Sequence, residues 1–302
     1  MPETIVKKSK KSGYQTAKKK SPSLWSEVWR RLKKSKTAMI GLFIIILVVL
    51  AAIFADFICD YETQVIKQNI AGKLQLPSKE HWFGTDAYGR DLFARVVHGS
   101  RISLVIGLAA TVGSVLISCL LGSVAGYYSG KVDNLIMRIT DMFMAIPSEL
   151  LALAIVASRG PGIFNLLIAV TIARIPPFTR ITRASILTVV DQEYVEASRA
   201  SGARDAYIIF RHILPNAMGP IIIQATMGVA RMILTAAGMS FIGMGVQPPA
   251  AEWGSMLAEG RDYMRYNPYV AIFPGLAIIL TSLSINLFGD GLRDALDPKL
   301  KD

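Results

Sequence analysis

The sequence contains few residues of the kinds that build metal sites and disulfides. It has two cysteines and three histidines in 302 residues. Cys59 and Cys119 lie far apart, and neither has a second cysteine, a histidine or an acid at ligand spacing. We therefore predict neither a metal site nor a disulfide framework. The sequence also lacks a Walker-type glycine-rich loop and the serine, histidine and aspartate order of a hydrolase, so no catalytic centre is predicted.

Charged residues are scarce too, at 18% of the chain, whereas hydrophobic residues make up 52% and the mean hydropathy is +0.41. This composition is too apolar for an ordinary soluble domain, and the length accommodates several membrane spans. We predict an all-α polytopic membrane protein with six transmembrane helices and both termini in the cytoplasm. The expected spans cover residues 38–58, 102–126, 135–157, 162–176, 219–243 and 269–288.

The net charge of +11 is concentrated in residues 1–37, which hold twelve Lys or Arg and two Glu. Nucleic-acid binding is not favoured, because no aromatic residues alternate with the lysines. Basic residues directly before an apolar span are typical of a cytoplasmic anchor beside anionic membrane lipid. We expect a disordered stretch over 1–24, followed by an interfacial amphipathic helix over 25–36.

Residues 59–100 are polar and mixed in charge, and we predict that they form an extracytoplasmic loop. His81, Asp86 and Asp91 within this loop could coordinate a metal ion, but no second histidine adjoins them. The turn-forming residues around them favour a folded loop instead. We assign no chemistry to this segment.

Several small or charged residues inside the spans have packing interpretations. Gly122, Gly126 and Gly130 recur every four residues, a spacing that permits close helix approach in lipid. Arg138 and Asp141 lie three residues apart near one end of the third span, which favours a local ion pair. We therefore assign both patterns to structure rather than to a ligand site.

Two features of the later spans bear on topology and transport. Pro176–Pro177 is expected to end the fourth span, although a re-entrant hairpin would also fit so short a run. If the run spans, the arginines of 177–217 face the cytoplasm, as the positive-inside rule prefers. Arg231 lies near the middle of the fifth span, where a cation is costly unless it is paired or faces water. It either lines a pathway and attracts an anionic end of the cargo, or pairs with an acid elsewhere.

The polar stretch 191–215 separates the fourth and fifth spans. Good helix formers predict a helix over 193–200, and Gly202 predicts a sharp stop. A second helical run is expected over 205–213. It should break at Leu214–Pro215, because proline disfavours helix at the preceding residue. We predict a rigid helix–turn–helix lever on the cytoplasmic side.

The same stretch resembles the cytoplasmic signature of permease subunits of binding-protein-dependent ABC importers. The matching residues are Glu196-Ala197-Ser198, Gly202 and Leu214-Pro215, at the spacing of the signature. Ser198 replaces an alanine of that signature, and His212 replaces an isoleucine. Further matches make the chain similar to the second permease subunit of oligopeptide, dipeptide and nickel importers: Phe83-Gly84-Thr85-Asp86, Gly89-Arg90-Asp91, residues 99–104, residues 240–249, Trp253-Gly254 and residues 290–298.

The resemblance implies an assembly of several subunits in a bacterial inner membrane. It implies a second permease of the same fold, two cytoplasmic ATPase subunits that bind ATP and Mg²⁺, and an extracytoplasmic substrate-binding protein. This chain would bind no cofactor of its own. Residues 101–290 would form the importer domain and residues 291–302 a cytoplasmic tail. The resemblance assigns ATPase coupling to Glu196, Ala197, Ser198, Ala200, Gly202, Leu214 and Pro215.

The predicted function is that of a non-catalytic permease subunit for peptides. Nickel complexes or another small solute are an alternative cargo for the same architecture. A self-sufficient secondary transporter is a second alternative, although the spans contain no chain of acidic residues or histidines for a proton relay. A membrane-anchored scaffold is a third.

Overall fold

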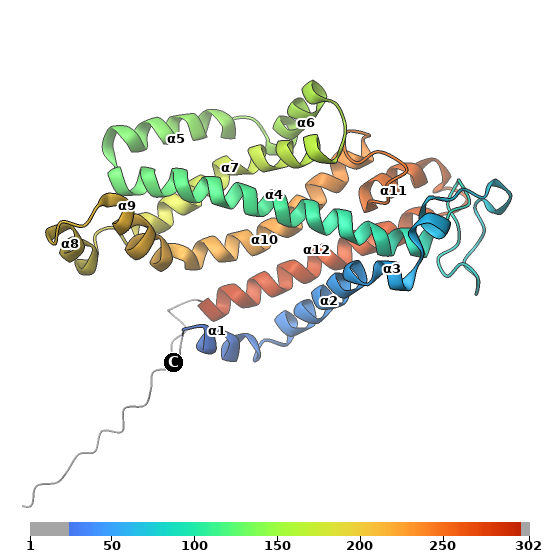
Figure 1. Ribbon diagram of the computed structural model, residues 1–302, viewed down its shortest axis with the longest axis horizontal. Coiled ribbons are helices and arrows are strands. Elements are labelled where there is room, and N and C mark those ends of the chain that lie inside the picture. Colours follow the sequence, from blue (N-terminus) through green and yellow to red (C-terminus); the bar gives the residue numbers. More distant parts are fainter. Residues whose placement is uncertain (1–23, 297–302) are drawn as a thin grey trace, which may run out of the picture.

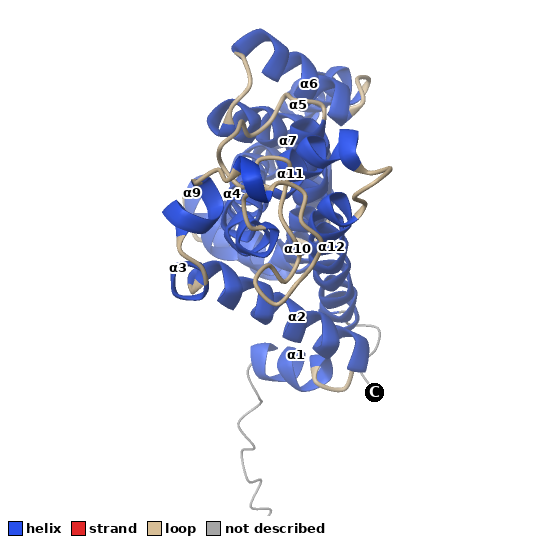
Figure 2. Ribbon diagram, turned by 90° about the vertical axis from the view of Figure 1, so that its right-hand side faces the viewer, coloured by secondary structure: helices blue, strands red, loops and turns tan. Residues whose placement is uncertain are grey.

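The computed structural model describes residues 24–296, and within this range the chain is built from helices without a β-strand (Figure 2). Five helices in this range are long and apolar enough to cross a membrane, and they lie together in one elongated bundle (Figure 1). They are α2 (Lys36–Ile53), α4 (Leu92–Tyr128), α7 (Ile163–Leu187), α10 (Leu214–Phe241, with the helical turns before it) and α12 (Tyr269–Leu296). The predicted all-α membrane fold is confirmed.

Shorter helical segments connect the long helices at the end of the bundle that holds residues 59–91. They are α3 (Ala55–Ile58), η1 (Tyr61–Ile66), η2 (Ile70–Gly72), α11 (Trp253–Gly260) and η4 (Arg261–Tyr263). Side-chain oxygens fix several helix starts by accepting backbone N–H groups that have no partner inside the helix. Ser35 caps α2, Asp91 caps α4 and Glu252 caps α11.

The apolar core lies where α4, α7 and α10 meet. Ile106 of α4, Leu166 of α7 and Met232 of α10 are fully buried there. A second buried cluster joins α10 to α12, and includes Ile233 and Ile278. The bundle is thus held by long apolar helices packed on one another, as their hydropathy predicts.

The segment predicted as the third span is broken in two. Helices α5 (Gly130–Met144) and α6 (Ser148–Arg159) meet at an angle of 82°, with Pro147 at the N-cap of α6. Proline supplies no backbone N–H and disfavours helix at the residue before it, which explains the break. Figure 1 shows that the pair leads the chain from the end of α4 to the start of α7. A sixth span exists only if the bent pair counts as one crossing, so the number six stays a prediction.

The expected end of the fourth span at Pro176–Pro177 is wrong. Helix α7 runs through both prolines to Leu187. Membrane helices tolerate proline where neighbouring helices and hydroxyls stabilise the local backbone. Hydroxyls of α4 donate to α7 carbonyls just before the pair: Ser114 Oγ to Thr171 O at 2.9 Å and Ser118 Oγ to Ile175 O at 2.9 Å.

Two of the three glycines that recur every four residues allow α4 and α7 to pack closely. A Cβ added to Gly122 would lie 2.6 Å from Cβ of Thr182, and one added to Gly126 would lie 2.8 Å from Cγ2 of Ile186. The packing interpretation is therefore confirmed for these two. It is wrong for Gly130, because a Cβ there would meet no atom within 4 Å and the residue has a φ of +56° at the start of α5.

Acidic side chains of α5 and α6 form ion pairs with arginines of α7 rather than with basic residues of their own helices. The local pair expected between Arg138 and Asp141 is wrong, because Asp141 contacts Arg180 of α7. Two further ion pairs join the same elements: Asp133 with Arg183 at 2.5 Å and Glu149 with Arg174 at 3.5 Å. The helices run beside each other, so acids on one meet arginines on the other across the interface.

The loop predicted over 59–100 is shorter than expected, because α4 begins at Leu92. Asp91 accepts the backbone N–H of Ala94 at 2.8 Å, and its second oxygen lies 2.7 Å from Nδ1 of His81. This cap starts the helix before the predicted position. Two of the side chains considered as metal ligands therefore contact each other and the backbone.

Four charged side chains hold this loop against α11. Asp86 accepts hydrogen bonds from Arg90 Nε and Arg95 Nη1, both at 2.6 Å. Glu259 of α11 accepts from Arg90 Nη2 at 2.6 Å. Burial raises the pKa of Glu259 to about 7, against the opposing effect of the Arg90 charge. Both arginines and Asp86 are buried, so the loop is a folded cap on the bundle.

Both described ends of the chain lie at the end of the bundle opposite this cap (Figure 1). Helix α1 (Leu24–Leu32) covers most of the helix predicted over 25–36, whose place at the membrane interface stays a prediction. It buries Val28 and Leu32 against Leu292 and Ala295 of α12. Helix α12 continues to residue 296, so the predicted tail over 291–302 begins as helix. The disorder predicted for the first residues lies outside the described residues except at position 24.

Candidate functional site

The segment between α7 and α10 folds as a helix, a glycine turn and a second helical run. Its parts are α8 (Glu193–Ala200), α9 (Asp205–Tyr207) and the π-helix η3 (Ile208–Ile213). Gly202 between them has a φ of +77°, a conformation that glycine adopts without the steric cost of a side chain. The predicted helix–turn–helix is confirmed.

Helix α8 is seated on an apolar cluster by one face. Val195 is fully buried beneath it and packs with residues from the end of α7, from η3 and from the start of α10. The buried members of the cluster are Ile186, Val189, Val190, Val195, Ile208, Ile213 and Ala217. This contact fixes the position of α8 relative to two long helices.

The outer face of α8 carries most of the residues to which the resemblance assigns ATPase coupling. Glu196, Ala197, Ala200 and Gly202 are exposed, and Ser198 is half-buried. A Cβ added to Gly202 would have no atom within 4 Å. Small side chains on an exposed face leave room for another surface to approach the backbone closely.

The break expected at Leu214–Pro215 is wrong. The helical path is continuous from Asp205 to Phe241, and Leu214 has α-helical φ and ψ of −57° and −44°. The N–H of Leu214 donates to the carbonyl of Ile209, five residues back, as in a π-helix. The wider turn lets the helix accept a residue that lacks an N–H, so Leu214 and Pro215, to which the resemblance assigns coupling, begin α10 without interrupting it.

A polar contact anchors this segment to the end of α4. The hydroxyl of Tyr127 donates to Asp205 Oδ1 at 2.8 Å, and that of Tyr128 donates to Asp205 Oδ2 at 3.0 Å. The guanidinium of Arg199 lies over the ring of Tyr127, 4.8 Å from its centroid. We call these four residues the tyrosine anchor. It ties both short helices to a third long helix.

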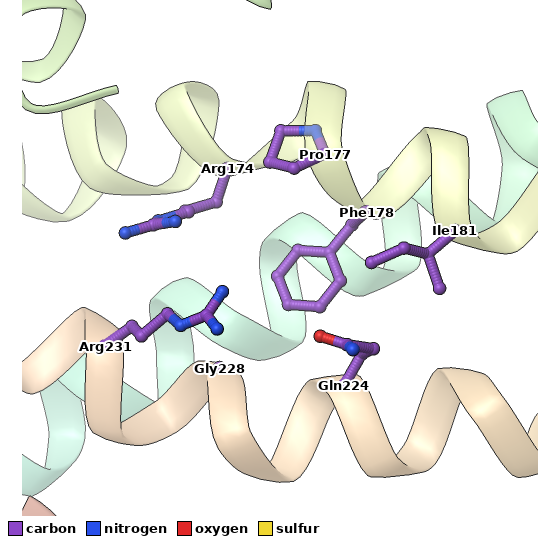
Figure 3. Close-up of a pocket in the computed structure, with 7 residues that line it drawn as sticks. All are labelled: Arg174, Pro177, Phe178, Ile181, Gln224, Gly228 and Arg231. Carbon is purple, nitrogen blue, oxygen red and sulfur yellow. The ribbon is translucent and has the colours of Figure 1, made fainter. Parts of the chain in front are cut away.

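Arg231 lines a pocket between α7 and α10 (Figure 3). A second arginine, Arg174 of α7, lines the same pocket, as does Gln224 of α10. Gly228 gives space to the Phe178 ring, since a Cβ there would lie 2.8 Å from Cζ of Phe178. The remaining lining residues are Pro177 and Ile181.

Residues 118–302 match the family described as binding-protein-dependent transport system inner membrane component. The chain belongs to this family. Residues 23–77 also match the N-terminal TM domain of oligopeptide transport permease C. The family resemblance found in residues 191–215 is therefore confirmed over most of the chain.

Similar proteins in this family carry peptide-related names and are similar over almost their whole length. The dipeptide transport system permease protein DppC of Alkalihalophilus pseudofirmus is 46% identical, over 92% of this chain and 91% of the relative. The di/tripeptide transport system permease protein DppC of Pseudomonas aeruginosa is 44% identical, over 93% and 94%. The glutathione transport system permease protein GsiD of Escherichia coli is 47% identical, over 92% and 91%.

Solved structures support the same fold. A chain of the MetNI methionine ABC transporter, in an inward-facing conformation, has a TM-score of 0.56 and 19% identity, and the match covers 67% of this chain and 96% of that one. A chain of an amino acid ABC transporter crystallised with histidines has a TM-score of 0.52 and 16% identity, over 67% and 94%. The chain is thus a multi-pass permease subunit with the fold of ABC importers.

Sequence reasoning located the exposed face of α8 and Arg231 but missed other residues of the permease. The tyrosine anchor joins Tyr127 to Asp205 across 78 positions, and no local pattern marks either residue. Arg174 and Gln224 gave no signal beyond being polar residues near or within predicted spans. These residues became visible only when the helices were placed side by side.

Proposed function

We propose that this permease subunit imports small peptides as half of a translocation pathway driven by ATP. The relatives described above are named for dipeptides, di- and tripeptides and glutathione, all of which are peptides. Their similarity covers both the bundle and the folded cap. Peptides are therefore the cargo that the comparisons favour over nickel complexes.

The outer face of α8 is the surface on which we expect an ATPase subunit to dock. The observation that carries this proposal is that α8 exposes small residues on its outer face while Val195, on its inner face, is buried in the bundle. The continuous helix from Asp205 into α10 passes any movement of the docked face into the bundle. A rigid swing of packed helices is a common way to open a cavity alternately to two sides.

The proposed assembly contains a second permease of the same fold, two ATPase subunits and an extracytoplasmic binding protein, in the inner membrane of a bacterium. ATP and Mg²⁺ would bind on the ATPase subunits, and this chain would perform no catalysis and hold no cofactor. The shared location of α1, α8 and the end of α12 supports a common cytoplasmic side for both termini.

Gly202→Asp tests the docking surface. The substitution places a charged side chain in a left-handed turn on the exposed face, so we expect loss of ATPase co-purification and of ATP-driven uptake. Gly160→Asp is a matched control, because Gly160 also has a positive φ, of +89°, and an equally open surrounding, but follows α6. Equal ATPase binding by the Gly202 variant and the wild type would refute the assignment.

The cargo is tested in a deletion strain complemented with this chain and its partner subunits. We expect restored uptake of dipeptides and unchanged nickel-dependent growth. Loss of nickel uptake in the deletion strain, together with normal peptide uptake, would favour nickel complexes. Gradient-driven uptake by the purified chain alone would support a secondary transporter instead.

A further inference from the structure

We propose that Arg174 and Arg231 together form a binding subsite for the carboxylate of the transported peptide. The subsite rests on the proposed function, because it assigns a chemical role to one face of the pathway. Figure 3 shows the two guanidinium groups in the space between α7 and α10, one from each helix. Gln224 lies two turns before Arg231 on α10 and faces the same pocket.

The charge in this pocket is not balanced by the chain itself. Arg174 lies 3.5 Å from Glu149, whose side chain is largely exposed. Within residues 24–296, no acid lies within the 4 Å of an ion pair from Arg231. One of the two cations therefore has a single exposed acid as its partner and the other has none within residues 24–296, so the pocket has capacity for an anion.

The positions of Arg174 and Arg231 indicate what the surface shared by α7 and α10 contacts in the membrane. Both arginines belong to helices that are long and apolar enough to span a membrane. A cation facing hydrocarbon in the middle of a span is costly, so such residues face water or protein. The α7–α10 face is therefore turned toward the shared pathway and its second permease rather than toward lipid.

A second pocket extends this face toward the end of the bundle that carries α8. It shares Ile181 and Gln224 with the first pocket and continues along the start of α10. Its other lining residues are Asn216, Gly219, Pro220, Ile223, Arg293 and Leu296. Amide and cationic groups thus follow the two arginines along the face, as expected for the route of a polar anionic cargo.

The ligand chemistry that fits is a carboxylate. Guanidinium groups bind carboxylates through paired hydrogen bonds in a fixed fork, and two such groups from opposing helices can clamp one anion. Dipeptides, tripeptides and glutathione share at least one free carboxylate at neutral pH. The alternative partner, an acid of the second permease, would make the arginines an assembly contact, and the experiment separates these two roles.

The test uses the complete transporter in proteoliposomes, with dialanine and dialanine amide as probes. Arg231→Gln, Arg174→Gln and the double variant are expected to lower uptake of dialanine by about tenfold or more, since hydrogen bonds to charged groups are involved. Uptake of the amide should change much less. Arg180→Gln is the matched control, because Arg180 lies on α7 outside the pocket.

The outcomes separate the subsite from the proposed function. Absence of ATP-dependent dialanine uptake by the wild type would refute the proposed function. Wild-type uptake with variants that lower both probes equally, or that lose the second permease on purification, would overturn the subsite alone. An unchanged ratio of dialanine to amide uptake in the variants would do the same.

A second measurement does not depend on the binding protein. Arg231→Cys is made with Cys59 and Cys119 replaced by alanine, and is treated in the complex with anionic and cationic methanethiosulfonates. The anionic reagent should react faster, and adding Arg174→Gln should lower the anionic-to-cationic rate ratio several-fold, because Arg174 is the subsite cation that is left once Arg231 has been replaced. No reaction with either reagent, or an unchanged ratio, would overturn the subsite.

Discussion

Replacing Tyr127 and Tyr128 together by phenylalanine removes the hydroxyls of the tyrosine anchor and keeps both rings. Two hydrogen bonds to Asp205, at 2.8 and 3.0 Å, are lost, whereas the stacking of Arg199 on the first ring can persist. Tyr128 is exposed, so water screens its bond, and only the bond of the half-buried Tyr127 is counted, at about 1 kcal/mol net. The Tyr127 bond therefore stabilises the docked position of α8 and α9 by about 1 kcal/mol.

A loss of about 1 kcal/mol corresponds to a change of roughly fivefold in the equilibrium between held and released positions. Amide hydrogen exchange of residues 193–207 in the assembled transporter should accelerate by up to that factor. A loosely held lever should also waste nucleotide, so more ATP should be hydrolysed for each peptide transported. Both quantities are measured on the same proteoliposome preparation.

Tyr207→Phe is the matched control for this double variant. Tyr207 lies on the same segment, and its ring packs against His212 rather than taking part in the anchor. We expect wild-type exchange and coupling for this control. The reasoning is refuted if the double variant exchanges at the wild-type rate, or if Tyr207→Phe changes exchange and coupling to the same extent.

Three further predictions concern the packing of α4 on α7, the folded cap and the buried face of α8. Gly122→Ala should destabilise the bundle by about 1–3 kcal/mol because its Cβ meets α7 at 2.6 Å, whereas Gly238→Ala, which meets no atom within 4 Å, should leave the melting temperature unchanged or higher. Asp86→Asn breaks a buried ion pair and should lower the free energy of unfolding, measured by thermal unfolding, by about 3–5 kcal/mol. The control Asp262→Asn, at an exposed ion pair, should leave that free energy almost unchanged. Val195→Ala should lower the free energy that holds α8 on the bundle by about 1–3 kcal/mol and so accelerate proteolysis of α8. Proteolysis at the wild-type rate would contradict the role of Val195 in seating α8.

The sequence predicted the long apolar helices well, but the effect of proline was misjudged at three sites in different ways. Pro147 broke a span that hydropathy alone had drawn as continuous. Pro176–Pro177 did not end α7, where hydroxyls of α4 contact the backbone just before the pair. Pro215 did not break the helix that enters α10, where a π-helix precedes it. The local preference of proline was the same each time, and the surrounding structure decided the outcome.

The candidate site divides in the same way. The exposed face of α8 was predictable because its residues are close together in the chain and their spacing is informative on its own. The tyrosine anchor and the pairing of Arg174 with Arg231 depend on contacts between helices that are distant in sequence. Such contacts follow from the register of helix packing, which single-sequence patterns do not specify.

The π-helix at Ile208–Ile213 also sets the angular phase of α10. A π turn holds one residue more than an α turn, and each residue of an α-helix turns the chain by about 100°. If the same residues were wound as an ordinary α-helix, everything after them would be rotated by about that angle relative to α8. Gln224 and Arg231 would then leave the face shared with α7. The one extra residue of the π turn thus determines which side of α10 faces α7.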